Sequence, residues 1–297
     1  MRLPPEAFAE LLVGTPYRVV ARIGQGGMGE VFEVEHELLG RRMVAKILHA
    51  RLANDPGFVE RMRVEAQSTA RLRHPNIVQV NDFCTTSTSR PCLIMEKLRG
   101  HTLAQELAQH GWLSIDGTFK IAEQLLSALS AAHRLGVVHR DLKPENLFLH
   151  TGTDGVQCLK VLDFGFARIL PSALARAPQP AAIPTGTGRL VGTPGFVPPE
   201  ALMGQPVDHR GDLYAVGLLL FAMLVGHGPF DHLTAEATLS HAPVPPSRFR
   251  NEPGVSALDV IVVKALKKKP GERHQSADEF ASELVRLRES LPLQAHQ

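Results

Sequence analysis

Residues 139–146, His-Arg-Asp-Leu-Lys-Pro-Glu-Asn, constrain this chain more than any other stretch. Seventeen residues after Asn146, the tripeptide Asp-Phe-Gly begins at Asp163. Together the two segments supply an aspartate that can receive a hydroxyl proton, a lysine beside it, and an amide and a second carboxylate that suit a hard metal ion. Phosphoryl transfer needs these parts, because it depends on positioning, on charge neutralisation by metal and on a base near the attacking hydroxyl. This set of residue types therefore favours phosphoryl-transfer chemistry.

A glycine-rich segment, residues 24–29, precedes these motifs. Glycines lack a Cβ, so their backbone amides can approach phosphate oxygens closely. The pattern alone is weak, because Rossmann folds use a similar one. In a Rossmann site the glycine turn opens a helix, whereas residues 31–35 alternate as a strand. The segment therefore predicts a hairpin flap over a nucleotide and argues against a dinucleotide-binding oxidoreductase.

These motifs resemble those of the protein kinases, and residues 17–290 are similar to the bacterial serine/threonine protein kinases of eukaryotic (Hanks) type. The resemblance implies an α+β, bilobal protein kinase fold. It has a β-rich N-lobe with one main helix and a mostly α-helical C-lobe. We accordingly expect a leader (1–16), an N-lobe (17–98), a C-lobe (99–290) and a C-terminal tail (291–297).

The same resemblance implies a role for individual residues. Asp141 positions the attacking hydroxyl and accepts its proton, and Lys143 steadies the same phosphate. Asn146 and Asp163 bind Mg²⁺, with Mn²⁺ as an alternative. The residues expected to bind ATP are the glycine loop and its flanks, a strand lysine with its helix partner, two hinge residues and the floor of the purine pocket: Ile23, Gly24, Gln25, Gly26, Gly27, Met28, Gly29, Glu30, Val31, Lys46, Glu65, Glu96, Leu98 and Phe148.

Lys46 interrupts an apolar run in the expected strand 42–48. A buried lysine needs an anionic partner, and the family pairs this lysine with phosphate oxygens and with a helix glutamate. Glu65 is the favoured partner and Glu60 the alternative. Val44 departs from the family, which has a smaller alanine there, and Met95 is the expected gatekeeper.

Hydrophobic periodicity predicts the secondary structure along the chain. We expect strands over residues 17–23, 31–35, 42–48, 92–96, 147–149 and 158–162, and helices over residues 58–72, 103–109, 119–135, 213–225, 258–266 and 278–287.

Residues 171–188 are rich in alanine and proline and show no apolar period, which indicates a mobile loop. Their place between Asp163 and residues 192–200 matches an activation segment. In the family, an arginine placed like Arg140 meets a phosphate on this segment. Thr185 and Thr187, and less favourably Ser172, are therefore the hypothesised autophosphorylation sites.

Two further pairings follow from the resemblance. Asp212 matches the helix aspartate that holds the backbone of the catalytic loop, and Arg273 is expected to pair with Glu200. Pro198 stands where the family has alanine. The three lysines 267–269 are expected to form a solvated helix end rather than a basic patch.

Net charge, cysteine content and the length of apolar runs limit the classes of binding partner that the chain is expected to have. A formal net charge of +2 argues against a strongly basic nucleic-acid binder. Three cysteines without a CxxC motif indicate reduced thiols, and the apolar run 215–225 is too short to cross a bilayer. We expect a cytoplasmic protein with no nucleic-acid or membrane partner. Its partners are protein substrates bearing Ser or Thr, and copies of itself for trans-autophosphorylation.

Two other classes share parts of this pattern. A pseudokinase or scaffold has the fold without transfer, but usually lacks one of the residues Lys46, Asp141 and Asp163, all present here. Kinases of aminoglycosides or choline lack the peptide-docking turn at residues 192–200. Both alternatives are less favoured than a protein kinase.

Overall fold

The computed structural model describes residues 10–26, 29–164, 196–231, 239–252 and 254–291. Within these ranges, the side chains of four residues of one helix, Phe58, Arg61, Glu65 and Ser68, are outside the description. The described residues form two compact units, one ending at Arg99 and the other starting at Gly100. They are called the N-terminal unit and the C-terminal unit below, and each is described by itself.

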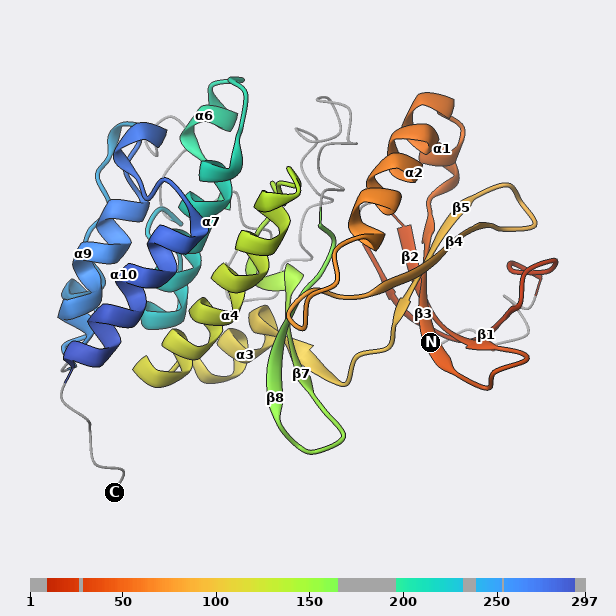
Figure 1. Cartoon of the computed structure of the whole chain (residues 1–297), viewed down its shortest axis with the longest axis horizontal. Helices are drawn as coiled ribbons and strands as arrows, with labels where there is room; N and C mark the ends of the chain where they lie inside the picture. The colour runs from red at the N-terminus through yellow and green to blue at the C-terminus, as the bar shows by residue number, and fades with distance from the viewer. Residues whose placement is uncertain (1–9, 27–28, 165–195, 232–238, 253, 292–297) are drawn as a thin grey trace, which may run out of the picture. The chain divides into compact units, whose positions relative to one another are not determined.

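The N-terminal unit contains a five-stranded antiparallel sheet with the strand order β1-β2-β3-β5-β4 (Figure 1). Its strands are β1 (Tyr17–Gln25), β2 (Gly29–His36), β3 (Arg42–Leu48), β4 (Val80–Thr85) and β5 (Pro91–Glu96). Between β3 and β4 the chain forms a short helix, α1 (Ala50–Ala53), and the longer α2 (Pro56–Ala70). Each expected strand in this unit is present.

Side chains on both faces of this sheet are buried. On one face Phe32, Val34, Ala45 and Ile94 pack with Tyr17. On the other, side chains of β3, β4 and β5 pack against Met62 and Ala66 of α2 and Leu52 of α1; those strand residues are Leu48, Val80 and Leu93. Alternation along each strand sends successive side chains to opposite faces, so the β-rich pattern in the sequence produces two apolar layers around one sheet.

The C-terminal unit is mostly helical. It begins with the three-stranded sheet β6-β7-β8, formed by β6 (Gly100–Thr102), β7 (Leu147–Thr151) and β8 (Gln157–Val161). Its helices are α3 (Leu103–His110), α4 (Ile115–Arg134), α6 (Pro199–Leu202), α7 (His209–Val225), α9 (Val255–Ala265) and α10 (Ala277–Ser290), with short 3₁₀ turns at Pro144–Asn146, Pro246–Arg248 and Pro270–Glu272.

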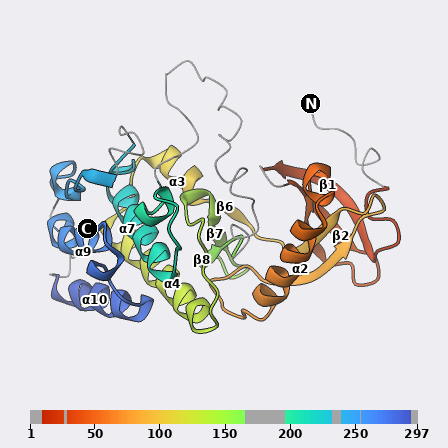
Figure 2. The ribbon, with the colours of Figure 1, turned by 90° about the horizontal axis from the view of Figure 1, so that it is seen from above.

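Helix α7 is the centre of this unit, because residues 211–224 are all buried. Helices α4 and α9 pack on α7, and α10 packs on α4 and α9 (Figure 2). A helix that is apolar on every side requires such surroundings. The α+β class, with one β-rich unit and one mostly helical unit, is confirmed. Among the described residues, no helix has the length and apolarity to cross a bilayer.

Several helices begin earlier than periodicity predicts. Helix α4 starts at Ile115 rather than at residue 119, because the Ser114 side chain accepts a hydrogen bond from Gly117 N and caps a polar first turn. Helix α7 starts at His209 rather than at residue 213, and Asp208 caps it through Arg210 N. The expected helix 58–72 is α2, shifted to Pro56–Ala70. Helix α1 and strand β6, four and three residues long, were not predicted.

Candidate active site

The loop at residues 139–146 in the C-terminal unit is held by one buried carboxylate, that of Asp212 on α7. His139 N donates to Asp212 Oδ2 and Arg140 N donates to Asp212 Oδ1, both at 2.8 Å. His133 of α4 reaches Asp212 Oδ2 through Nε2, also at 2.8 Å. The Asp212 side chain is 1 % exposed, so these donors replace water around a charge that would otherwise be costly to bury. The expected anchoring role of Asp212 is confirmed.

His139 links the loop to the segment that carries Asp163. Its ring is fully buried. Nε2 lies 2.8 Å from the carbonyl oxygen of Leu162, and Asp141 N donates to Nδ1 at 3.2 Å. The ring also meets Phe164 edge-on, with the ring centroids 4.7 Å apart. A single imidazole therefore fixes the backbone on both sides of the site.

Asp141, Lys143 and Asn146 gather around one carboxylate. Lys143 Nζ donates to Asp141 Oδ1 at 3.1 Å and lies 2.9 Å from Oδ2. Asn146 Nδ2 donates to the Asp141 carbonyl oxygen at 2.7 Å and to Oδ2 at 3.1 Å. The Asp141 side chain is 39 % exposed, so its oxygens can be reached from solvent. The site thus presents an accessible base with a cation beside it.

Asn146 is positioned to offer its other side-chain atom to a cation. Since Nδ2 is used by Asp141, Oδ1 is the atom that can act as a ligand. Leu162 N donates to the Asn146 carbonyl oxygen at 2.9 Å, which ties Asn146 to the residue before Asp163. An amide oxygen and a carboxylate are hard donors that suit Mg²⁺, which usually completes its shell with water and phosphate oxygens. The donor set therefore fits the expected metal.

Two residues of this site adopt left-handed backbone conformations. Arg140 has a φ of 67° and Asp163 a φ of 55°. Residues other than glycine rarely do so, although aspartate and asparagine do so more often than most, and such conformations persist where the surroundings determine them. Here Asp212 holds the Arg140 amide, and the Leu162 contacts precede Asp163. The backbone is thus specialised next to the groups that the chemistry would use.

In the N-terminal unit, the glycine segment joins β1 to β2. Gly26 N donates to Gly29 O at 2.8 Å across the turn. A Cβ on Gly29 would lie 2.2 Å from the Ile47 carbonyl oxygen, so no larger residue fits there, whereas a Cβ on Gly26 would meet nothing within 4 Å. Gly27 and Met28 lie outside the described residues. The expected strand–loop–strand flap is present in place of a strand–loop–helix.

The side chains that flank this loop vary in exposure. Ile23 is 52 % exposed, and Val31 is half-buried and pairs with Gly24 across the hairpin. The Glu30 carboxylate forms ion pairs with Arg22 at 3.1 Å and Arg90 at 3.2 Å. Gln25 Oε1 accepts a hydrogen bond from Arg22. The two polar side chains that flank the loop, Gln25 and Glu30, are therefore paired with arginines of the same unit.

Lys46 lies in the middle of β3, opposite Val31 on β2 and Leu93 on β5. It is half-buried, between the fully buried Ala45 and Ile47. The alternative partner Glu60 pairs with Arg63 at 2.6 Å on the exposed side of α2, which disfavours it as the partner of Lys46. The side chain of Glu65 lies outside the described residues.

The strand β5 leads to the expected hinge. Gln79 N donates to Glu96 Oε1 at 2.8 Å, and Glu96 N donates to Gln79 O at 3.0 Å. Both the amide and the carboxylate of Glu96 are therefore used within the protein. Leu98 follows and is half-buried. In the sheet, Met95 is the direct neighbour of Val44, so the residue that departs from the family pattern abuts the expected gatekeeper.

Phe148 belongs to the C-terminal unit, where β7 pairs it with Thr102 of β6 and Lys160 of β8. It is half-buried. A Cβ on Gly100 would lie 3.4 Å from Phe148 Cε1 and 2.0 Å from the Leu149 carbonyl oxygen, which explains the glycine. One side of the Phe148 ring therefore lies against Gly100, where a residue with a side chain would not fit.

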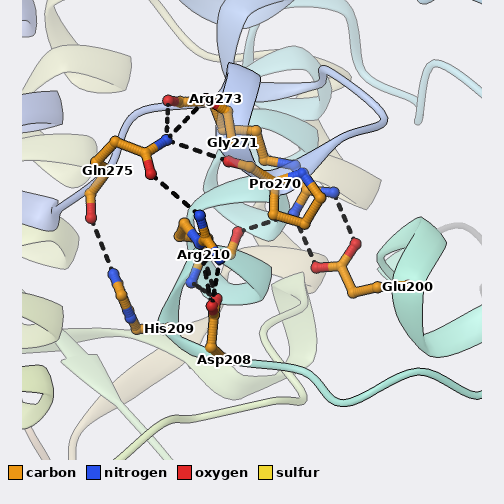
Figure 3. Close-up of polar contacts among 8 residues, drawn as sticks. All are labelled: Glu200, Asp208, His209, Arg210, Pro270, Gly271, Arg273 and Gln275. Carbon is orange, nitrogen blue, oxygen red and sulfur yellow. Dashed lines mark hydrogen bonds and ion pairs between the residues drawn. The ribbon is translucent and has the colours of Figure 1, made fainter.

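A second buried ion pair joins Glu200, at the start of α6, to Arg273 in the turn before α10. Arg273 donates to Glu200 Oε1 from Nη1 at 2.8 Å and to Oε2 from Nη2 at 2.7 Å (Figure 3). Arg273 also donates to the carbonyl oxygens of Lys267, Lys268 and Arg210. The Arg273 side chain is fully buried and that of Glu200 is 4 % exposed. The expected pairing is confirmed.

These motifs and this geometry agree with a comparison of the whole sequence. The profile of the protein kinase domain matches residues 17–289. The chain belongs to the protein kinase family. As a member of that family, it is similar to curated serine/threonine-protein kinases. It is 39% identical over 295 residues to pkn3 of Myxococcus xanthus, which covers 96% of this chain and 52% of pkn3. It is 35% identical over 286 residues to the probable kinase PknB of Corynebacterium glutamicum, covering 93% of this chain and 43% of that protein.

Solved structures show the same fold for this kinase-family chain. The kinase domain of Mycobacterium tuberculosis PknI aligns with a TM-score of 0.71 and 27% identity, covering 92% of this chain and 96% of that domain. The expected family of bacterial Hanks-type serine/threonine kinases is confirmed. The chain spans about half the length of pkn3 and of the Corynebacterium PknB.

Sequence reasoning missed two features of this kinase-family chain. The first is His133, whose only signal is its spacing of six residues before His139. The second is Lys268. The expectation that residues 267–269 form a solvated helix end is wrong for Lys268, which is half-buried with Nζ 4.1 Å from the centroid of the Phe230 ring. Burial lowers the pKa of Lys268 to about 8, and the charge of Arg273 adds to this.

Proposed function

We propose that this chain transfers the γ-phosphate of ATP to serine and threonine hydroxyls of proteins. The observation that carries the proposal is the Asp141 carboxylate, which is solvent-accessible, paired with Lys143 and held in a loop that Asp212 anchors. Membership of the protein kinase family supports the same reaction.

Each group in the loop has a role in this proposal. Asp141 orients the substrate hydroxyl and takes up its proton as the oxygen attacks. Lys143, already beside that carboxylate, places positive charge near the phosphoryl group that is transferred. Asn146 Oδ1 and the Asp163 carboxylate would hold Mg²⁺ or Mn²⁺, and the bound metal would neutralise charge on the phosphates. Lys143, together with Thr193 in the segment 192–200, resembles the serine/threonine rather than the tyrosine version of the kinase motif, which supports serine and threonine as the acceptors.

In this proposal, ATP binds to the residues that were predicted to bind it from the sequence. The glycine loop offers backbone amides to the phosphates, and its side chains are turned to other partners. Lys46 orients the phosphates, with Glu65 proposed to fix Lys46. The Glu96 carbonyl oxygen and the Leu98 backbone are proposed to bind the adenine, since the Glu96 amide and carboxylate are occupied. Phe148 and Val31 would contact the purine faces.

The test is phosphoryl transfer by the purified chain. The chain is incubated with Mg²⁺, γ-labelled ATP and dephosphorylated casein, and phosphoamino acids are identified after hydrolysis. We expect label on phosphoserine and phosphothreonine, and its loss in Asp141→Asn, which preserves the shape of the side chain. Nucleotide binding by both forms without transfer by either would contradict the proposal and indicate a pseudokinase.

We also propose that autophosphorylation of the activation segment regulates the activity. Arg140 is exposed and directly precedes Asp141. Its guanidinium could bind a phosphate through charge-assisted hydrogen bonds. The candidate acceptors Thr185, Thr187 and Ser172 lie outside the described residues. Phosphopeptide mapping should find Thr185 or Thr187 modified in active protein, and an active preparation with neither modified would contradict the proposal.

Transfer between two copies is the proposed route. Active chain is mixed with a size-tagged Asp141→Asn chain, which cannot phosphorylate itself. Label on the inactive chain, increasing with the concentration of the active one, is the expected result. Label confined to the active chain at every concentration would indicate transfer within one molecule.

A further inference from the structure

Two of the three cysteines face each other across a pair of strands. Cys84 on β4 and Cys92 on β5 are direct partners in the antiparallel register, and the two strands run side by side (Figure 1). Cys92 is fully buried in the core beneath the sheet, and Cys84 is half-buried at its edge. The third cysteine, Cys158, lies on β8 in the C-terminal unit, opposite His150.

The two thiols are neighbours on adjacent strands, and their surroundings make them chemically unequal. The neighbouring thiol of Cys92 lowers the pKa of Cys84, and the same interaction raises the pKa of Cys92. Burial raises the pKa of Cys92 further. The Asp82 carboxylate opposes ionisation of Cys84, but Tyr17 Oη donates to that carboxylate at 2.9 Å and partly satisfies its charge. Cys84 is therefore both the more accessible and the more readily ionised sulfur.

The backbone between the two residues already suits a disulfide. Directly opposite residues in an antiparallel pair have Cα atoms about 4.5 or 5.5 Å apart, depending on the hydrogen-bond pattern. Disulfides need a Cα separation of about 4.4 to 6.8 Å. Both register types meet this range, so a bond requires side-chain adjustment rather than movement of a strand.

We propose that Cys84 and Cys92 are an oxidative modification site, at which a hydroperoxide converts the two thiols into a disulfide across β4 and β5. The Cys84 thiolate attacks an oxygen of the hydroperoxide, the O–O bond breaks, and an alcohol or water leaves with a proton. Cys84 becomes a sulfenic acid. Cys92 sulfur then attacks Cys84 Sγ, the S–O bond breaks, and water leaves with the Cys92 proton. The two sulfurs together lose the two electrons that the peroxide gains.

The test follows the thiols of the full chain by mass spectrometry. The reduced protein is treated with hydrogen peroxide for graded times, alkylated and digested with trypsin without reduction. Arg90 precedes Pro91, a bond that trypsin cuts poorly, so both cysteines stay in one peptide. We expect that peptide to lose two hydrogen atoms and to take up no alkyl group, and reduction to restore both thiols. Cys158 should remain open to alkylation while this peptide is being oxidised.

Two variants assign the roles, each compared with wild type by thermal unfolding in the reduced state. In Cys92→Ser, Cys84 should accumulate as a sulfenic acid that dimedone traps, because no second thiol can resolve it. In Cys84→Ser, Cys92 should resist peroxide, because it is buried. Wild-type protein that accumulates dimedone-reactive Cys84 without the internal disulfide would overturn the proposal. Oxidation of Cys158 at the same rate as the pair would do so as well, and neither result depends on a variant that folds.

Discussion

At the scale of single residues, Asp212 and His139 determine the conformation of the loop that carries Asp141. Neither touches a substrate in the proposed reaction. Asp212 accepts hydrogen bonds from two successive backbone amides and from His133. His133 Nδ1 is buried and has no hydrogen-bond partner among the described residues, so Asp212 is the polar group that its ring contacts through Nε2. The conformation of the loop therefore depends on the Asp212 carboxylate, which is shielded from solvent.

Asp212→Asn tests this dependence. The amide of asparagine can accept from one side only, so at least one donor loses its partner, at a cost of about 1–3 kcal/mol. We expect kcat to fall roughly 10- to 100-fold while the KM for ATP changes by less than about threefold. Steady-state kinetics measures both. Asp208→Asn, which changes the exposed cap of the same helix, is the matched control and should retain most of the activity. Normal kcat in a folded Asp212→Asn protein would contradict the role.

His274 should make the stability of the protein depend on pH. Its ring is fully buried and stacks on Phe280, with the centroids 3.8 Å apart. Burial lowers the pKa of His274 from 6.5 to about 4, helped by the charge of Lys264, while Glu283 and Glu279 oppose the shift. Between these two values the unfolded chain binds more protons than the folded one, so stability falls as the pH falls through this window.

The comparison variant is His274→Phe, which keeps a stacked ring and cannot titrate. Relative to this variant, the wild-type free energy of unfolding should decrease by up to about 3 kcal/mol between neutral pH and the folded pKa. Urea unfolding of both proteins at a series of pH values measures the difference. Parallel pH dependence of the two proteins would show that His274 does not contribute.

At the scale of elements, the Glu200–Arg273 pair joins the start of α6 to the turn before α10. The guanidinium is bidentate and also meets three carbonyl oxygens, so both charges are satisfied without water. The pair lies beside Asp208, Arg210 and Gln275, which link the beginning of α7 to the same turn (Figure 3). Side-chain contacts rather than a sheet therefore connect the starts of α6 and α7 to the turn before α10.

Arg273→Gln should destabilise the C-terminal unit strongly. It leaves the buried Glu200 carboxylate without a counter-charge, and breaking a buried pair costs about 3–5 kcal/mol. Arg134→Gln is the control, because Arg134 pairs with Asp278 at 3.5 Å between side chains that are 66% and 68% exposed. An exposed pair contributes about 1 kcal/mol or less. Chemical unfolding measures both changes, and equal costs for the two variants would contradict the argument.

At the scale of the whole molecule, nucleotide and metal should stabilise the folded protein together. A ligand present at about 100 times its dissociation constant stabilises the native state by about 2.7 kcal/mol. We expect a non-hydrolysable ATP analogue with Mg²⁺ to raise the unfolding temperature more than the analogue with EDTA. Asp163→Ala should lose the magnesium-dependent part, and Asp154→Ala, in the exposed β7–β8 turn, should not. An equal response of wild type and Asp163→Ala would contradict the metal role.

Short motifs carried most of what could be predicted, because each combines residue types with a spacing that the backbone must satisfy. The contacts of Asp212 with His139 and of Glu200 with Arg273 were expected from the resemblance of such motifs to those of the protein kinases, although the partners lie 73 residues apart in the chain. His133 and Lys268 were not, since their surroundings arise only when α4, α7 and the turn after α9 pack. Helix starts at Ile115 and His209 were also missed, because polar first turns carry no apolar period and depend on caps.

The Glu200–Arg273 pair also bears on how the chain is made. A ribosome synthesises Glu200 seventy-three residues before Arg273, an interval of roughly 4–15 s at about 5–20 residues per second. During that interval the carboxylate must stay in contact with water or with a chaperone, because its partner does not yet exist. The C-terminal unit can therefore close only after the turn before α10 has left the exit tunnel.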